Sequence, residues 1–251
     1  MSELFSIQLQ NRQQQGRDGI WLDLPTTTEQ VQAALRQIGI SSDNPQGLFI
    51  SGYFAEEEKR FAIPYNMVLA SNVDELNFLA SRLETLSTGE RAELNAALQA
   101  PQSELFSIGR ITDFPENVDY YVHLPDVHGP AQLGDYYLNR SGMVNMPEEW
   151  KGGIDTAQFG RYVAQQEQGA FTQYGYLVKS GDEWQKVHEG QSVPEEYRVL
   201  SFPAPEILRD AANIPPPVQP ETEPQKVIPI ILNGKDSAER MKEITDRLET
   251  G

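Results

Sequence analysis

SELFSI occurs twice in this chain, at Ser2–Ile7 and again at Ser103–Ile108. Each copy leads through a polar stretch to a short apolar run that ends in Leu-Pro, IWLDLP at Ile20–Pro25 and YYVHLP at Tyr120–Pro125. From Phe5 to Gln10 apolar and polar residues alternate, and this period of two predicts a half-buried strand. The repetition therefore predicts two α+β units that each begin with a similar β-hairpin. Duplication and convergent use of a good edge strand are the alternative origins.

We expect the second hairpin to share the faces of the first. Its buried face would carry Phe106, Ile108, Tyr120, Val122 and Leu124. Tyr121 and His123 would lie on the opposite face, at the places that Trp21 and Asp23 take in the first hairpin.

Capping signals and apolar spacing predict the elements after the first hairpin. Thr26-x-x-Glu29 is a capping box for a helix that runs to about Ile38 and stops at Gly39, and 47–54 is predicted as a third strand. Four leucines then follow at helical spacing, and Ser87-x-x-Glu90 caps a second helix after a short joint. This pair of helices, over 73–99, is predicted to pack as an antiparallel helical hairpin.

The second half of the chain ends in a looser segment. A short helix is predicted over 131–138, a helix capped by Asp155 runs to about Gln166, and 170–178 is predicted as one closing strand. A proline-rich spacer follows, and the final residues combine the apolar run VIPIIL with an amphipathic helix whose apolar stripe must dock on something.

Together these elements predict an α+β protein that is an elongated chain of small domains. The predicted organisation is an N-terminal α+β unit (1–65), a helical hairpin (66–101), a second α+β unit that begins with the repeated SELFSI hairpin (102–190), a proline-rich linker (191–225) and a C-terminal strand–helix tail (226–251).

The charge of the chain is unusual. Its 251 residues include 37 Asp and Glu against 20 Lys and Arg, so that the net charge is −17. Duplex DNA carries one charge per ~1.7 Å, so seventeen charges correspond to about 29 Å of duplex. Such a chain should repel nucleic acid and anionic membranes and attract basic surfaces, although an acidic surface that serves solubility is the alternative explanation.

Composition also excludes several classes of chemistry. The chain has no cysteine, so disulfides, thiol catalysis and cysteine-ligated zinc are ruled out. Its N-terminus, MSELFSIQLQ, has no signal-peptide pattern, and no apolar run approaches the length that spans a bilayer. We therefore expect a cytoplasmic protein that binds neither membranes nor nucleic acid.

A search for catalytic motifs finds none. NGKDS at Asn233–Ser237 lacks the earlier glycine of a phosphate loop, and neither a dinucleotide-binding glycine motif nor a nucleophile elbow is present. HLPDVH places His123, Asp126 and His128 close together, but an outward strand residue and a turn explain them without a metal. We predict no enzyme activity, no cofactor, no metal and no catalytic residues; a hydrolase that uses scattered carboxylates is a remote alternative.

Several stretches resemble the antirestriction protein ArdA family, namely GIWLDLP, VDELNFLASRLETL, LGDYYLNRSGMVNMPEEW and IDTAQFGRYVAQQEQGAFTQYGYLV. The similarity covers roughly 4–187. It implies an acidic, several-domain α+β protein of a mobile element such as a conjugative transposon, which acts as a homodimer and mimics bent duplex DNA. It also implies, as partner, the methyltransferase core of a Type I restriction–modification enzyme, whose DNA-binding channel the protein occupies.

The resemblance and the charge together give the leading hypothesis, a non-enzymatic DNA-mimic inhibitor. The residues expected to replace phosphates are Asp74, Glu75, Glu84, Glu90, Glu93, Glu148, Glu149, Asp155 and Glu167. The alternative is an acidic adaptor of a conjugative element that docks a partner through its C-terminal helix and has no antirestriction activity.

Overall fold

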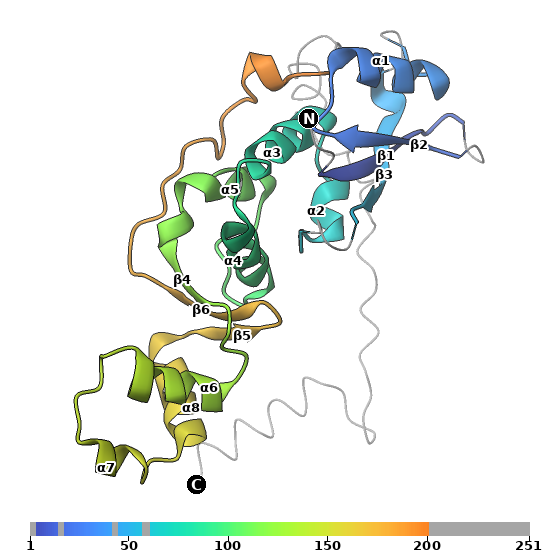
Figure 1. Cartoon of the computed structure of the whole chain (residues 1–251). Helices are drawn as coiled ribbons and strands as arrows, with labels where there is room; N and C mark the ends of the chain where they lie inside the picture. Colours follow the sequence, from blue (N-terminus) through green and yellow to red (C-terminus); the bar gives the residue numbers. More distant parts are fainter. Residues whose placement is uncertain (1–3, 15–17, 42–44, 57–60, 201–251) are drawn as a thin grey trace, which may run out of the picture. The chain divides into compact units, whose positions relative to one another are not determined.

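A computed structural model of the protein describes residues 4–14, 18–41, 45–56 and 61–200 (Figure 1). The chain divides into two compact units, 1–202 and 203–251, and the second lies outside the described residues. The predicted strand–helix tail and most of the predicted linker therefore also lie outside them. The described helices and strands are β1 (Phe5–Asn11), β2 (Ile20–Leu24), α1 (Thr28–Gln37), β3 (Leu48–Phe54), α2 (Tyr65–Leu69), α3 (Val73–Leu83), α4 (Thr88–Gln99), α5 (Ile108–Thr112), β4 (Tyr121–Leu124), α6 (Pro130–Asp135), the π-helical turn η5 (Tyr136–Arg140), α7 (Glu148–Lys151), α8 (Thr156–Glu167), β5 (Ala170–Thr172), β6 (Gly175–Lys179) and the 3₁₀ turn η6 (Glu195–Tyr197). This mixture of helices and antiparallel sheets confirms the predicted α+β class.

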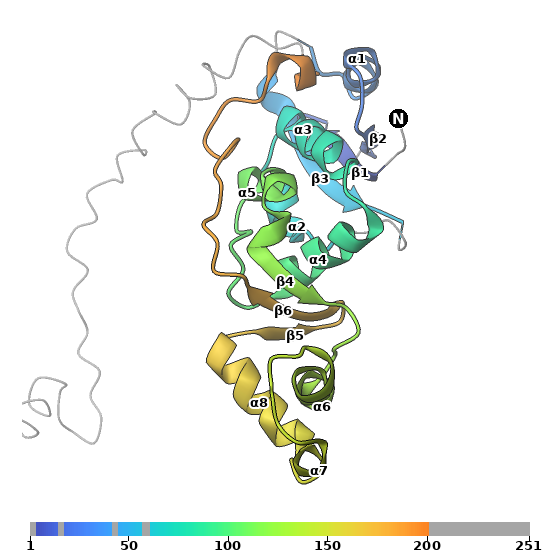
Figure 2. The ribbon, with the colours of Figure 1, turned by 60° about the vertical axis from the view of Figure 1, so that its left-hand side comes forward.

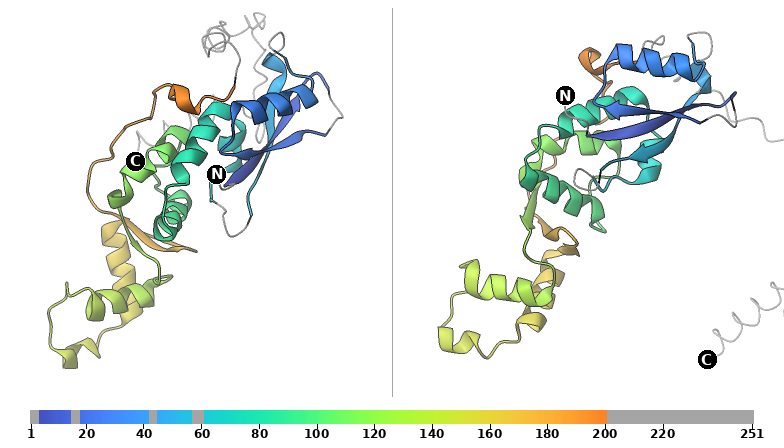
Figure 3. Two further views of the ribbon diagram at one scale, coloured as in Figure 1. Left: turned by 45° about the horizontal axis from the view of Figure 1, so that its top comes forward. Right: turned by 45° about the vertical axis from the view of Figure 1, so that its right-hand side comes forward.

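The first sheet has the strand order β2–β1–β3, with both pairs antiparallel. The β1–β2 hairpin is confirmed, and Ile7 lies opposite Leu22 in its register. Alternate residues of β1 are buried, so Phe5, Ile7 and Leu9 point into the core while the residues between them face outward. Helix α1 contacts β2 and covers this buried side of the sheet (Figure 3).

Helix α1 begins one residue later than its sequence signal suggested. Thr27 is the N-cap, and the capping box is completed by Gln30 rather than by Glu29. The helix stops where predicted: Gly39 has φ = +68°, a left-handed conformation that glycine adopts without strain.

The two helices predicted over 73–99 are α3 and α4, and the capping box of Ser87 and Glu90 at the start of α4 is confirmed. Their expected packing against each other is not what the structure has. Helix α3 packs mainly on α5 and β2, whereas α4 packs on β4 and β6. Leucines from both helices are buried in the same core, but each helix packs against different neighbouring elements.

The predicted second SELFSI hairpin is wrong. Ser107 N-caps α5, and the residues that would have formed a strand lie partly in this helix. The cause is the sequence that follows the repeat. The first copy continues with Leu9 two positions after Ile7, whereas in the second copy the next apolar residues come at Ile111 and Phe114, at helical spacing.

The strand β4 is present, but its partner and its faces differ from the prediction. It pairs with β6, in a second sheet of order β4–β6–β5. Tyr121 is buried and Val122 is 45% exposed, so the predicted faces are reversed. The predicted single closing strand is the β5–β6 hairpin, which turns where Gly175 takes φ = +119°.

Helices α6 and α8 pack closely on each other beside the second sheet (Figure 2). Asp155 caps α8 as predicted, through a bond from the Gln158 amide. The predicted helix over 131–138 is α6 with the turn η5. Val127, Leu133 and Tyr176 form a small core here, separate from the large core that extends from the first sheet through α3 and α4 to Val199.

After β6 the chain runs back to α3 over residues 180–200 without regular strands, and we call 180–200 the returning segment. Residues 185–189 bind to Asp113 and Asn117, at and after the end of α5, and 197–200 bind to α3, so 197–200 is attached to the fold rather than part of a free linker. The domain boundaries drawn from the sequence remain predictions. Within the described residues, no helix has both the length and the apolar character needed to cross a membrane.

Candidate interaction surface

The nine acidic residues predicted as phosphate mimics lie in two regions. Five are on α3 and α4 or at their ends, and all five are partly buried. The other four lie between α7 and the end of α8, where Glu148, Glu149 and Asp155 are exposed and Glu167 is partly buried. The local environment differs from one carboxyl group to the next, and it decides whether that group can present a negative charge to a partner.

Asp74, in the first turn of α3, holds another segment of the chain. Its Oδ1 accepts hydrogen bonds from the amides of Val199 and Leu200, at 2.7 and 2.8 Å. Burial raises the pKa of this carboxyl, and the two amide bonds and nearby Arg198 oppose that rise. Asp74 therefore serves to attach 199–200 to the first turn of α3.

Glu75 and Glu90 complete the capping boxes of α3 and α4. The carboxylate of Glu75 accepts from the Asn72 amide, and that of Glu90 accepts from the Ser87 amide at 2.7 Å. Hydrogen bonds from the Ser87 side chain and backbone lower the pKa of Glu90, so it stays charged at neutral pH. Glu84 follows α3 as its half-buried C-cap residue.

Glu93 differs from its neighbours because its carboxyl is enclosed. Burial, with the nearby charges of Glu90 and Asp119, raises the pKa of Glu93 to about 8. Its Oε1 is buried and has no hydrogen-bond partner among the residues that the structure describes. A carboxyl in this state is neutral at pH 7, so Glu93 is poorly suited to replace a phosphate.

The acidic residues of the α7–α8 region include the most accessible of the nine. Glu148 pairs with Lys151 at 2.6 Å, and Asp155 accepts from the Gln158 amide as the cap of α8. Glu167 instead accepts hydrogen bonds from the hydroxyls of Tyr137 and Tyr176, which ties α8 to η5 and to β6. Burial is the first cause that raises the pKa of both tyrosines, so both hydroxyls stay protonated and continue to donate.

Further exposed acidic residues were not singled out from the sequence as sites. They are Asp18, Asp23, Glu29, Glu56, Asp119, Asp126, Asp182, Glu183, Glu195 and Glu196. The exposed cations of the described residues are fewer: Arg12, Arg36, Arg140, Arg161, Lys179, Lys186 and Arg198. The acidic pairs at 182–183 and 195–196 are visible in the sequence, but their exposure depends on the course of the returning segment.

A buried polar clamp that sequence reasoning missed fixes this returning segment. Asp113 is fully buried, and its carboxylate accepts from the amides of Val187, His188 and Glu189 at 3.2, 2.6 and 3.1 Å. Arg110 bonds Glu189 at 3.1 Å beside it. The sequence gives no signal for these contacts, because Asp113 and Arg110 lie more than seventy residues before the groups that they bind.

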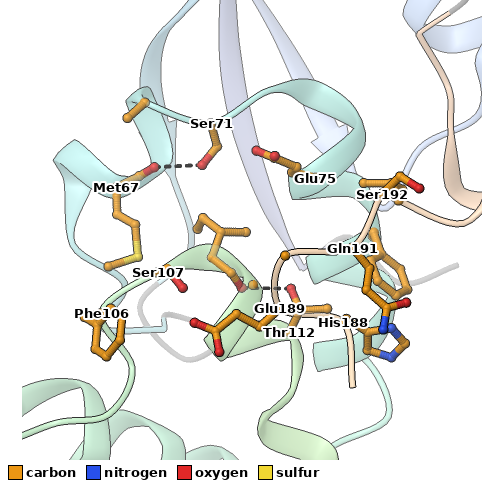
Figure 4. A pocket seen from close by; sticks show the side chains of 16 residues that line it. Met67, Ser71, Glu75, Phe106, Ser107, Thr112, His188, Glu189, Gln191 and Ser192 are labelled. Carbon is orange, nitrogen blue, oxygen red and sulfur yellow. Dashed lines mark hydrogen bonds between the residues drawn. The ribbon is translucent and has the colours of Figure 1, made fainter. Parts of the chain in front are cut away.

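An open depression of about 510 Å³ lies between α2, α3, α5 and the returning segment (Figure 4). Met67, Phe78 and Phe106 give it apolar walls, and Glu75 and Glu189 lie at its lining. The HLPDVH stretch lies elsewhere, and there His123 Nε2 is 2.7 Å from the Tyr174 carbonyl oxygen. No cluster of three or more metal-binding side chains was found among the residues that the structure describes.

Comparison with known protein families gives a match over most of the chain. A protein-family model described as antirestriction protein (ArdA) matches residues 15–178. The matched range contains helices α1 to α8 and the described strands apart from β1 and the last residue of β6. It also contains six of the ten exposed acidic residues named above and all nine predicted ones. A search of curated proteins found no match to the chain.

Proposed function

Because the chain belongs to the antirestriction protein (ArdA) family, we propose that it is an acidic DNA mimic that inhibits Type I restriction–modification enzymes. In this proposal it binds the methyltransferase core and occupies the channel that otherwise holds DNA. It acts without catalysis, as a homodimer in the cytoplasm, and is encoded by a mobile element.

The observation that supports mimicry is the distribution of exposed charge on folded elements. Exposed carboxylates outnumber exposed cations among the described residues, and they occur from the first hairpin to the returning segment. An enzyme that binds DNA presents lysine and arginine to phosphates, and the same side chains form strong, charge-assisted hydrogen bonds with carboxylates.

Several of these carboxylates are attached to rigid positions. Asp155 caps α8 and Glu29 lies in the first turn of α1. The partly buried Glu90 is likewise fixed, because it completes the capping box of α4 with Ser87. A carboxylate held by a folded element loses less conformational freedom on binding than one on a floppy tail, so the folded surface is the better inhibitor.

Among the nine predicted residues, the environments divide the proposed roles. Glu148, Glu149 and Asp155 are the leading phosphate mimics because they are exposed. Glu75, Glu84 and Glu90 are proposed as secondary contacts. Asp74 and Glu167 bind groups of the fold itself and Glu93 is enclosed, so substitution of these three residues should act mainly on folding.

The experiment that tests this assignment neutralises the three exposed carboxylates together. The variant Glu148→Gln, Glu149→Gln, Asp155→Asn keeps the size of each side chain, and asparagine is also a good helix cap. We expect an unchanged fold and weaker inhibition of a Type I enzyme. A matched control changes the exposed Gln165, Gln166 and Gln173 to Asn, which alters no charge. Full potency of the neutralised variant would refute the assignment of these three residues.

A further inference from the structure

The outward face of the first sheet carries an exposed pair of aromatic rings. Trp21 on β2 is 49% exposed and Phe54 at the end of β3 is 57% exposed. Their ring centroids are 6.4 Å apart and the rings stand at 72° to each other. The two rings therefore form an open corner, and we call Trp21, Phe54 and Asp23 the aromatic corner.

The register of the three strands builds this corner. Gln8 on β1 lies opposite Trp21 on one side and Gly52 on the other. Because Gly52 has no side chain, the indole can extend across the sheet; a Cβ placed there would be 3.0 Å from the indole Cη2. Two residues earlier on β1, and on the same face, Ser6 lies between Asp23 and Phe54. Its hydroxyl donates a 2.6 Å hydrogen bond to the Asp23 carboxylate.

Elsewhere the chain covers aromatic rings with its own cations. Arg12 lies 5.4 Å from the centroid of Phe49 on β3, and Arg110 lies 4.6 Å from that of Phe106. In the described part of the chain neither Trp21 nor Phe54 has such a cation. The corner offers a ring face of the same kind with its cation position open, next to a carboxylate.

We propose that the aromatic corner binds the guanidinium group of an arginine side chain from the partner protein. A planar guanidinium stacks on an aromatic face and also donates hydrogen bonds to a carboxylate, which suits Trp21 and Asp23 together. Charge favours this occupant over a second copy of the chain. The charge within the aromatic corner is the Asp23 carboxylate, whereas Arg12 on the same face lies over Phe49, and the whole chain has a net charge of −17.

The inference rests on the proposed function for the identity of the partner, a DNA-binding enzyme whose arginines are directed at phosphates. It adds a contact that duplex DNA does not make from its phosphates. Such a contact depends on the shape of the guanidinium and not only on its charge, so it responds less to salt than the carboxylate contacts do.

A titration of the full-length protein with small probes tests the corner directly. The indole N–H signals of the three tryptophans are followed by NMR, and Trp21→Phe identifies that of Trp21. N-acetyl-arginine amide should shift the Trp21 signal saturably, with millimolar affinity, the lysine analogue less, and the uncharged citrulline analogue not at all. Equal shifts with citrulline, or no saturable shift with arginine, would overturn the inference.

Three of the chain's own cations outside the described residues are tested in the same way, namely those nearest in sequence to β2 and β3. If changing Arg17, Lys59 and Arg60 to Gln moves the Trp21 signal without probe and creates arginine binding that the natural chain lacks, the corner is filled from within and the inference fails. An unchanged Trp21 signal and unchanged arginine affinity would support it.

Inhibition measurements connect the corner to the partner. Trp21→Ala with Phe54→Ala should weaken inhibition about two- to fivefold, the range of an exposed cation–π contact, with no change in salt dependence. The control is Phe106→Ala, an exposed ring already covered by Arg110, which should inhibit like the natural chain. Arginine binding by a protein that inhibits no restriction enzyme would refute the proposed function alone, whereas full inhibition by a chain that binds no arginine would refute the inference alone.

Discussion

At the scale of single residues, the carboxyl groups of this acidic chain divide into those that present charge and those that hold the fold. Glu148 and Glu149 are exposed. Asp113 and Asp74 instead bind backbone amides of distant segments, and Glu93 is enclosed near two other acids. Counting acidic residues therefore overestimates the charge available to a partner, because a buried carboxyl serves packing or is protonated.

The pKa of Glu93 predicts a pH dependence of stability. The folded state holds a proton on Glu93 up to about pH 8, whereas the unfolded chain releases it near 4.5, so this group lowers stability as pH rises between those values. Glu93→Gln removes the effect. We expect it to raise the free energy of unfolding at pH 9 by about 1–2 kcal/mol, allowing for partial solvent screening, and to change it little at acid pH.

Urea denaturation at several pH values measures this difference. Glu29→Gln is the matched control, because hydrogen bonds with its own backbone and Thr27 lower the pKa of that carboxyl and it should give no gain at high pH. A Glu93→Gln variant that is no more stable than the natural chain at pH 9 would contradict the enclosed state of Glu93.

Asp113 supports a second prediction at this scale. Asp113→Ala leaves three amides of the returning segment without their acceptor, so we expect a loss of about 2–4 kcal/mol in unfolding free energy. Hydrogen exchange at Val187, His188 and Glu189 should quicken selectively. The exposed Asp126→Ala is the control and should change neither quantity; slow exchange retained in Asp113→Ala would show that the clamp does not fix the segment.

At the scale of elements, two glycines set the distance between α6 and α8. A Cβ on Gly160 would lie 1.8 Å from the Pro130 carbonyl oxygen, and one on Gly134 would lie 1.9 Å from that of Thr156. Gly160→Ala should therefore push the helices apart and destabilise the fold by about 3 kcal/mol or more, as overpacking does at its upper range. Gly89→Ala, in a helix and with nothing near its Cβ, should be neutral or slightly stabilising in the same thermal melts. Equal stability of the two variants would contradict this close approach.

Elements with strong local signals could be predicted from the sequence. The first hairpin, α1, α3, α4 and α8 follow from alternation, leucine spacing and capping residues, which act within a few positions. The second SELFSI copy could not be predicted by analogy, because six identical residues do not determine a structure when the residues after Ile108 change the period from two to three.

The candidate site was less predictable than the fold. The sequence shows where acidic residues lie, but burial decides which of them are accessible and charged. Exposure of Glu148 and Glu149 and enclosure of Glu93 come from packing between distant segments. The aromatic corner was missed for the same reason, since Trp21 and Phe54 meet across a third strand.

At the scale of the whole molecule, the two compact units allow the proposed function to be separated from the C-terminal tail. The ArdA match ends at residue 178, well before the second unit begins at Pro203. Deleting 227–251 should therefore leave inhibition of a Type I enzyme within about twofold of the full chain, a difference of under about 0.5 kcal/mol. Loss of inhibition on this deletion would favour the alternative in which the tail is the docking element.

The net charge makes a second prediction for the whole molecule, and one competition measurement tests it together with mimicry. A labelled duplex of about 40 bp is bound to the purified methyltransferase core of a Type I enzyme, the protein is added, and duplex release is followed at low and high salt. We predict stoichiometric displacement of the duplex that weakens as salt rises. No displacement at micromolar protein, or displacement that is indifferent to salt, would contradict the proposal that this acidic surface takes the place of DNA.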